Sequence, residues 1–178
     1  MKFQSKKYDI QDRILWELFL DSACRISAIQ NLKLEQLRLE EGYFEGVKEK
    51  EGYIVNAFFF EKCKILLKEW IKYREDKEIT SEWLFITKYR SVFRQMSQGT
   101  IRNRIKKMGL ILDIPDLYPH TLRKSSINLI NNLAGLGVAS SYANHTSSNV
   151  TSKHYLQKAN PMEVRNNIIQ LRKKLGIF

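Results

Sequence analysis

Two residues that could bind and protonate a phosphate group lie close together in the segment His120-Thr-Leu-Arg123. Side chains at positions i and i+3 project from the same face of a helix. The imidazole can transfer a proton near neutral pH, and the guanidinium can bind two phosphate oxygens at once. The pair therefore favours chemistry at a phosphate, although an HxxR match alone is common by chance.

Further residues of suitable type lie on both sides of this pair. Arg25 lies upstream, in the segment Ala-Cys-Arg-Ile-Ser, and Lys50 lies in a predicted hairpin turn just before Gly52. His145 and Tyr155 lie downstream, at the two ends of the segment His-Thr-Ser-Ser-Asn-Val-Thr-Ser-Lys-His-Tyr. All of these side chains have types that can act on a phosphodiester, as clamp, acid, base or nucleophile.

In this order, and over about residues 9–157, these residues resemble the tyrosine recombinase (phage integrase) family. The resemblance implies the catalytic-domain fold of that family, with breakage and rejoining of DNA strands by a tyrosine. It implies a 3′-phosphotyrosyl link, which a 5′ hydroxyl of a partner strand then attacks. We therefore expect no cofactor and no metal site.

The resemblance assigns six catalytic candidates, which are Arg25, Lys50, His120, Arg123, His145 and Tyr155. In the family, the first arginine precedes the sheet and the lysine lies in its hairpin. The first histidine and second arginine form an HxLR box. The second histidine lies in an LGH(S/T)S segment, written Ala-Asn-His-Thr-Ser-Ser here, and the nucleophilic tyrosine follows it.

Physical chemistry gives each of these groups a role. The transition state at a phosphodiester is highly anionic, so two arginines can stabilise it with fixed donors. Tyrosine has a pKa near 10, so only about a thousandth is ionised at pH 7. The nucleophile therefore needs neighbouring cations and a proton acceptor, for which we predict His120. Lys50 can protonate the departing 5′ oxygen, and His145 can donate a hydrogen bond to a phosphate oxygen.

Some alternatives stay open at individual positions. Lys48 competes with Lys50 for the hairpin lysine, because the length of such hairpins varies. Tyr142 is a weaker alternative nucleophile. His154 adjoins Tyr155, but neighbouring side chains point apart, so we assign it no role. A zinc site built from the three histidines and two cysteines would need unusual geometry and is not expected.

Two positions depart from the family. Ala28 stands where the family usually carries an acid, three residues after Arg25, so another group must orient the site or activity falls. Asn144 replaces the glycine before His145. Two other functions therefore stay open. One is a DNA-binding protein of the same fold that does not cleave, and the other is a type IB topoisomerase-like enzyme that relaxes DNA.

In the first half of the chain, helices and three short strands are predicted to position these residues. Apolar residues at helical spacing predict helices at about 9–20, 25–31 and 63–71. Alternating apolar residues between turns predict short strands at about 34–39, 43–47 and 53–58. The charged residues 72–82 are predicted to form a connecting loop. The fold class is α+β, mainly α, with a small three-stranded antiparallel sheet near the N-terminal third.

The second half is predicted to be helical without strands. The predicted helices are 98–109, 120–134 and 160–175, with loops and short helical pieces at 135–152. The last helix begins with a favourable cap at Asn160-Pro161-Met-Glu163 and carries an apolar stripe. That stripe could pack on its own core or on a neighbouring protomer.

Basic residues gather in this second half. Residues 1–82 hold 15 basic and 16 acidic side chains, a net charge of −1, whereas residues 83–178 hold 15 basic and 3 acidic ones, a net charge of +12. A field of one sign attracts a polyanion, and double-stranded DNA is the partner we expect. The DNA-binding candidates are Arg102, Arg104, Lys106, Lys107 and Lys124.

Length and composition suit one compact domain. The 178 residues, 43% of them hydrophobic, are expected to form a single catalytic domain over 1–178, with no N-terminal core-binding domain. No apolar run is long enough to cross a bilayer, and we expect a cytoplasmic protein without membrane contact. The resemblance implies a homotetramer on paired DNA sites for a full-length protein and leaves a monomer open for this domain.

Overall fold

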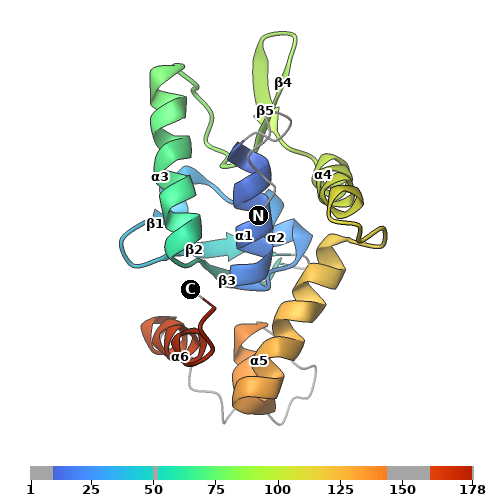
Figure 1. Cartoon of the computed structure of the whole chain (residues 1–178). Coiled ribbons are helices and arrows are strands. Elements are labelled where there is room, and N and C mark those ends of the chain that lie inside the picture. Colours follow the sequence, from blue (N-terminus) through green and yellow to red (C-terminus); the bar gives the residue numbers. More distant parts are fainter. Residues whose placement is uncertain (1–9, 50–51, 144–160, 178) are drawn as a thin grey trace.

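The computed structural model describes residues 10–49, 52–143 and 161–177 (Figure 1). The first half of the described chain forms α1 (Ile10–Ser22), α2 (Ile26–Gln30), the 3-10 turn η1 (Leu34–Gln36), β1 (Leu37–Arg38), β2 (Tyr43–Lys48), β3 (Ile54–Phe58) and α3 (Glu61–Asp76). The second half forms β4 (Ile86–Tyr89), β5 (Val92–Gln95), α4 (Gln98–Ile111), α5 (Pro119–Tyr142) and α6 (Pro161–Lys174).

Helix α1 lies at the centre of the fold. It packs against α3, α4, α5 and β3, and Figure 1 shows it between α3 on one side and α4 and α5 on the other. Ile14, Leu15, Leu18 and Phe19 are fully buried. Gln11 is buried as well, and its side chain accepts a hydrogen bond from the backbone of Ile86 at 2.8 Å. Both the apolar face and the first turn of α1 are therefore held, which fixes the position of the residues that follow the helix.

The three-stranded antiparallel sheet is confirmed. Strand β2 pairs with β1 and β3, and its register places Tyr43 opposite Phe58 and Lys48 opposite Ile54. The first strand is shorter than the predicted 34–39, because its first residues form the turn η1. The side chain of Gln36 accepts a hydrogen bond from the backbone of Lys33 at 3.0 Å and so closes that turn.

The prediction that residues 72–82 form a loop is wrong for the first part of that segment. Helix α3 continues to Asp76. The charged run that indicated a loop contains a buried arginine, which holds this last turn of the helix against the chain that follows. Arg74 is 3% exposed, lies over the ring of Trp70 and donates hydrogen bonds to the carbonyls of Ser81 and Trp83. These bonds also fasten the chain that follows α3 back onto the helix.

A second, two-stranded sheet escaped the sequence prediction. Strands β4 and β5 pair in an antiparallel register that places Tyr89 opposite Val92. The two residues between them, Arg90 and Ser91, have φ angles of 45° and 67°. Two-residue hairpin turns of this kind usually carry glycine or asparagine, which are absent here, so the turn lacks its usual sequence mark.

Helix α5 continues beyond the predicted end at 134 and must reverse its direction. A straight helix rises about 1.5 Å per residue, so Arg123 and Ala143 would lie about 30 Å apart. Yet the guanidinium of Arg123 donates to the carbonyl of Ala143 at 2.8 Å. Figure 1 shows the last, darker turns of α5 folded back beside its middle. Gly135 and Gly137 lie in this stretch, and glycine is a frequent cause of sharp kinks.

Helix α6 closes the fold against α5 and the end of α1. A small apolar cluster joins these parts and consists of Ala23, Phe60, Ile130, Ala139, Tyr142 and Ile168. The larger core lies between α1, α3, α4 and the sheets. In this chain α6 therefore packs on its own core.

Candidate active site

Arg25 stands at the start of α2, directly after the end of α1. It is the N-cap residue of α2, and Ala23 before it has a φ of 48°, so the chain turns sharply there. The backbone N–H of Arg25 donates to Oε1 of Glu49 at 3.2 Å, and its Nη1 donates to Oε2 of the same carboxylate. The side chain of Arg25 is 43% exposed, so part of the guanidinium faces solvent.

Arg123 stands in the second turn of α5 and is buried. Its Nη1 donates to the carbonyl of Ala23, and its Nη2 donates to the carbonyl of Ala143 at 2.8 Å. Burial lowers the pKa of Arg123, and the positive charge of Arg25 lowers it further. The two arginines, 98 positions apart in the sequence, are thus brought close enough to repel each other.

His120 lies in the first turn of α5, one turn before Arg123. Pro119 begins the helix, and the hydroxyl of Thr121 accepts a hydrogen bond from the backbone of Tyr118 at 2.8 Å. Proline suits the first helical position because its missing N–H would be unpaired there anyway. His120 is exposed at this end of the helix, where its imidazole can reach a ligand.

Three of the predicted catalytic residues, Lys50, His145 and Tyr155, lie outside the described residues. The structure describes their neighbours along the chain in two cases. Glu49, next to Lys50, contacts Arg25, and Ala143, two residues before His145, contacts Arg123. His154, to which we assign no role, also lies outside the described residues.

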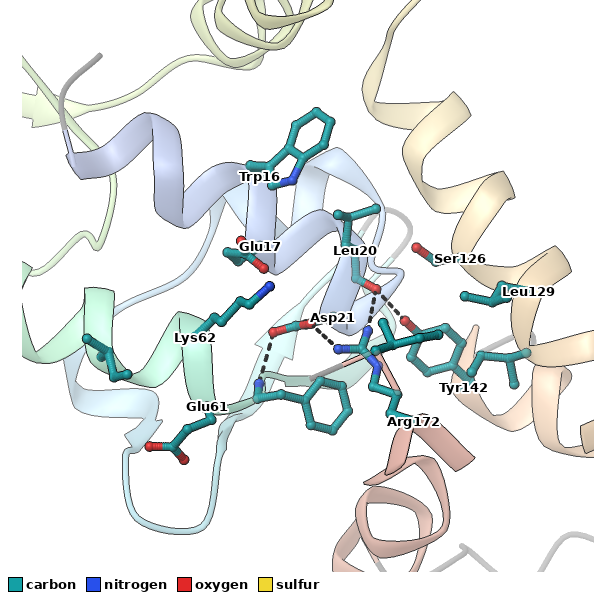
Figure 2. Close-up of a pocket in the computed structure, with 14 residues that line it drawn as sticks. Trp16, Glu17, Leu20, Asp21, Glu61, Lys62, Ser126, Leu129, Tyr142 and Arg172 are labelled. Atoms are coloured by element: carbon teal, nitrogen blue, oxygen red, sulfur yellow. Dashed lines mark hydrogen bonds and ion pairs between the residues drawn. The ribbon is translucent and has the colours of Figure 1, made fainter. Parts of the chain in front are cut away.

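Tyr142, the alternative nucleophile, is held as a structural residue (Figure 2). It is 1% exposed, and its hydroxyl donates a hydrogen bond to the carbonyl of Leu20 at 2.7 Å. Burial raises the pKa of Tyr142 far above its ordinary value, which disfavours the phenolate that would attack. We therefore withdraw it as a nucleophile.

Figure 2 also shows how α6 is fastened to the end of α1. Arg172 on α6 forms an ion pair with Asp21 at 2.7 Å and lies 4.1 Å from the ring centre of Phe60. The other oxygen of Asp21 accepts from the backbone of Phe60 at 2.9 Å. The pocket of about 500 Å³ beside this contact is lined in part by Tyr142, but by none of the six catalytic or five DNA-binding candidates.

The predicted DNA-binding residues of α4 do not all face solvent. Arg102, Lys106 and Lys107 are exposed, as is Lys124 on α5. Arg104 instead turns inward and forms an ion pair with Asp12 of α1 at 2.8 Å. Its role in the structure is to join α4 to α1.

The hairpin of β4 and β5 adds basic residues that the sequence prediction missed. Lys88, Arg90 and Arg94 are all exposed. The guanidinium carbons of Arg90 and Arg94 lie 5.4 Å and 5.6 Å from the ring centre of Tyr89. The sequence does contain a signal for this basic hairpin, since residues 83–112 contain basic side chains and no acidic one.

Within residues 10–49, 52–143 and 161–177, no three His, Cys, Asp or Glu side chains lie close enough together to bind a metal ion. Cys24 and Cys63 are both free and buried, and burial raises the pKa of each thiol. Among the helices described, none is long and apolar enough to span a membrane.

Comparisons with known proteins agree with this architecture. The phage integrase family matches the chain over residues 1–161. The tyrosine recombinase XerA of Pyrococcus horikoshii is 26% identical over an alignment of 168 residues, which covers 86% of this chain and 55% of that protein. The chain therefore belongs to the phage integrase family, and it spans about half the length of this relative.

Solved structures show the same fold. The crystal structure of a XerA recombinase matches with a TM-score of 0.68 and 19% identity, over 92% of this chain and 57% of the other. The XerH recombinase bound to its difH substrate matches with a TM-score of 0.66 and 19% identity, over 81% of this chain and 42% of the other. The fold is that of a tyrosine recombinase catalytic domain.

Proposed function

We propose that this chain is the catalytic domain of a site-specific DNA recombinase or integrase and that Tyr155 is its nucleophile. The observation that carries the proposal is the convergence of Arg25 and Arg123. Arg123 of the kinked α5 donates to the carbonyl of Ala23, two residues before Arg25, and so holds the two arginines together although their repulsion and burial are unfavourable. An arrangement that costs free energy in the free protein is typical of a site built for an anionic ligand.

The reaction follows from the groups assigned to this site. The phenol oxygen of Tyr155 attacks the phosphorus of a DNA phosphodiester while the bond from phosphorus to the 5′ oxygen breaks. Arg25 and Arg123 stabilise the negative charge on the non-bridging oxygens, and His120 accepts the phenol proton. Lys50 donates a proton to the departing 5′ oxygen, and His145 donates a hydrogen bond to a phosphate oxygen. The product is a 3′-phosphotyrosyl link and a free 5′ hydroxyl.

Both arginines retain donors for a phosphate. A guanidinium has five N–H groups, and the two hydrogen bonds from Arg123 to the carbonyls of Ala23 and Ala143 use two of them. Glu49 meets one Nη of Arg25, whose side chain is partly exposed. The buried contacts fix the orientation of each fork, which lowers the cost of ordering it when DNA binds.

Both hairpin lysines, Lys48 and Lys50, adjoin Glu49, and we assign the catalytic role to Lys50 on the family resemblance. Successive side chains of a strand point to opposite faces. Glu49 is buried against Arg25, whereas Lys48 before it is exposed and its backbone carbonyl accepts a hydrogen bond from Asn31 at 3.0 Å. Lys48 therefore points away from the face on which Arg25 lies, but this alternation alone does not separate it from Lys50, which also adjoins Glu49.

Double-stranded DNA is the substrate we propose, with contacts from exposed basic residues on three elements. These residues are Arg102, Lys106 and Lys107 on α4, Lys124 on α5, and Lys88, Arg90 and Arg94 on the hairpin of β4 and β5. Such contacts to phosphates supply affinity and register, whereas sequence preference requires contacts to bases or DNA deformation.

Covalent trapping tests the proposal. A duplex selected from a random library for binding to the protein is nicked near each candidate scissile phosphate, so that a released fragment diffuses away and religation fails. We expect a protein–DNA adduct that survives denaturation, forms in EDTA and is lost in Tyr155→Phe. Tight binding without any adduct would support the binding-only alternative. An adduct followed by relaxation of supercoiled DNA, without exchange between two sites, would support the topoisomerase-like one.

A further inference from the structure

The carboxylate of Glu49 holds Arg25 at two points. One oxygen accepts from the backbone N–H of Arg25 at 3.2 Å, and the other accepts from the Nη1 of its guanidinium. A single carboxylate thus fixes both where the residue stands and where its side chain points. Charge-assisted hydrogen bonds of this kind are stronger and more directional than neutral ones.

Burial differs sharply between the two partners of this ion pair. The side chain of Glu49 is 1% exposed, whereas that of Arg25 is 43% exposed. The carboxylate therefore lies behind the guanidinium, on its protein side, and leaves the solvent side for a ligand. A buried acid without a partner would be costly, so Glu49 requires Arg25 in this position.

Helix α2 offers no acid to do this work. Ala28 lies one turn after Arg25, is fully buried, and donates its backbone N–H to the carbonyl of Arg25 at 3.0 Å. Its methyl group packs in the main core. The acid that orients Arg25 therefore comes from the hairpin of β2 and β3, across a sequence separation of 24 residues.

The same contact joins Arg25 to the tip of that hairpin. The backbone N–H of Glu49 donates to the carbonyl of Tyr53 at 2.7 Å, and its carbonyl accepts from the N–H of Gly52 at 3.3 Å. Asn31, at the other end of α2, donates to the carbonyl of Lys48 at 3.0 Å. Both ends of α2 therefore hold the hairpin stem, directly beside the sequence position of Lys50.

We propose that Glu49 is a positioning residue that aims Arg25 at the scissile phosphate and joins it to the hairpin of β2 and β3, in place of an acid on α2. The inference rests on the proposed DNA-cleaving function. The negative charge of Glu49 also offsets the repulsion between Arg25 and Arg123. Arg25 lowers the pKa of Arg123, and Glu49 raises it. Glu49 acts through Arg25 and contacts no reacting atom.

The test compares Glu49→Gln with Glu45→Gln. Glutamine keeps the volume of the side chain and removes its charge. Glu45 lies on the same hairpin, is exposed and pairs with Arg38 at 2.7 Å, so its variant makes the same charge change away from the site. Cleavage of the nicked duplex, DNA affinity and thermal unfolding are measured for each variant. In parallel, the NMR relaxation of the Nε–H group of Arg25 reports the order of its guanidinium without any DNA.

We expect Glu49→Gln to slow cleavage about tenfold to a hundredfold, because a misplaced clamp loses its alignment with the transition state. Its DNA affinity should stay within about threefold and the guanidinium of Arg25 should become mobile, while Glu45→Gln behaves like the unmodified protein. Cleavage by Glu49→Gln within twofold of the unmodified rate would overturn the proposal, as would an Arg25 guanidinium that keeps its order. If the unmodified protein forms no adduct, the proposed function fails, and the NMR comparison alone still decides the role of Glu49.

Discussion

At the start of α5, the guanidinium of Arg123 joins parts of the chain that lie far apart in sequence. It donates to the carbonyl of Ala23, between α1 and α2, and to the carbonyl of Ala143, at the end of α5. The residue that we assign to the phosphate thus also holds the kinked helix closed. Loss of this side chain should affect folding and catalysis together.

Arg123→Met tests the structural share of that role. The variant leaves two buried carbonyls without their charged donor, and we expect it to lower the free energy of unfolding by about 2 kcal/mol. Chemical denaturation measures this change. Lys124→Met, one position on and exposed, should change it by less than about 0.5 kcal/mol. An Arg123→Met protein as stable as the unmodified one would contradict the role we give to these bonds.

Tyr142→Phe separates the structural tyrosine from the proposed nucleophile. The change removes one buried hydrogen bond, from the hydroxyl to the carbonyl of Leu20, and should cost about 1 kcal/mol of stability. Because Tyr155 is unaltered, the covalent adduct should still form at a rate close to that of the unmodified protein. Gel analysis of the trapped complex decides this point, and disappearance of the adduct would return Tyr142 to the reaction.

At the scale of elements, the hairpin of β4 and β5 places three exposed cations beyond the helices predicted to bind DNA. Each phosphate contact that is lost should reduce the slope of log K against log salt by about one. We expect this for Arg90→Ala and Arg94→Ala, measured by fluorescence anisotropy across a salt series. Lys72→Ala on α3 is the matched control, since it removes an exposed charge elsewhere. Equal slopes for all three variants would remove the hairpin from the interface.

The ion pair between α6 and the end of α1 has a predictable pH dependence. Burial raises the pKa of Asp21, and Arg172 opposes that rise. In Arg172→Met the buried carboxylate loses its partner, so we expect a loss of about 3 kcal/mol in the free energy of unfolding at pH 7.5. The folded protein then binds a proton on Asp21 more tightly than the unfolded chain does, so the loss should shrink as pH falls through the raised pKa.

Denaturation of Arg172→Met at pH 7.5 and at pH 5 measures both effects. The neighbouring exposed Lys173 provides the control variant Lys173→Met, for which little change is expected at either pH. A loss of the same size at both pH values would mean that the cost arises from packing on Phe60 rather than from the charge of Asp21.

Sequence periodicity was sufficient for elements whose exposed face is polar and whose buried face is apolar. Strands β2 and β3 and the helices α2 and α4 follow their predicted ranges closely, whereas β1 is shorter than predicted. It failed where a charged residue is buried, as at Arg74, because a charged residue on the buried side of α3 interrupts the apolar pattern that indicates a helix. It also failed at Arg90 and Ser91, whose left-handed turn lacks glycine, and at the glycines of α5, which lie within the helix instead of ending it.

The candidate site was only partly predictable for the same kind of reason. The types and order of Arg25, His120 and Arg123 were visible in the sequence, and so was the missing acid at Ala28. The contribution of Glu49 was not, because it depends on how the hairpin stands against α2. Likewise, nothing local distinguishes Arg104, paired with Asp12, from the exposed basic residues around it.

At the scale of the whole molecule, three buried groups should weaken the fold in alkaline solution. Burial raises the pKa of Cys24 from 9.0 to about 11, and it raises the pKa values of Cys63 and Tyr142 as well. The unfolded chain releases these protons at a lower pH than the folded chain does. The free energy of unfolding should therefore fall as pH rises from about 9 toward 11.

Cys24→Ala should make this decline shallower by about 2 kcal/mol over that range, because one of the three groups no longer titrates. Denaturant titrations at a series of pH values measure the slope. A slope that is identical with and without the Cys24 thiol would contradict the protonated, buried state assigned to it.

The charge distribution along the chain agrees with the DNA contacts proposed for its second half. The net charge is +11, and the excess lies in the half that contains α4, α5, α6 and the second hairpin. This chain covers 55% of the length of the XerA relative from Pyrococcus horikoshii.

The most direct test of the central claim identifies the residue that becomes covalently linked to DNA. The trapped adduct is digested with nuclease and trypsin, and the peptide that carries a nucleotide is identified by mass spectrometry. Cleavage after Lys153 and Lys158 releases His154-Tyr155-Leu-Gln-Lys158, which contains a single tyrosine, whereas Tyr142 lies in the separate peptide from Ser125 to Lys153. We predict the nucleotide on the peptide of Tyr155, attached through its 3′ phosphate. A nucleotide on any other peptide would contradict the account.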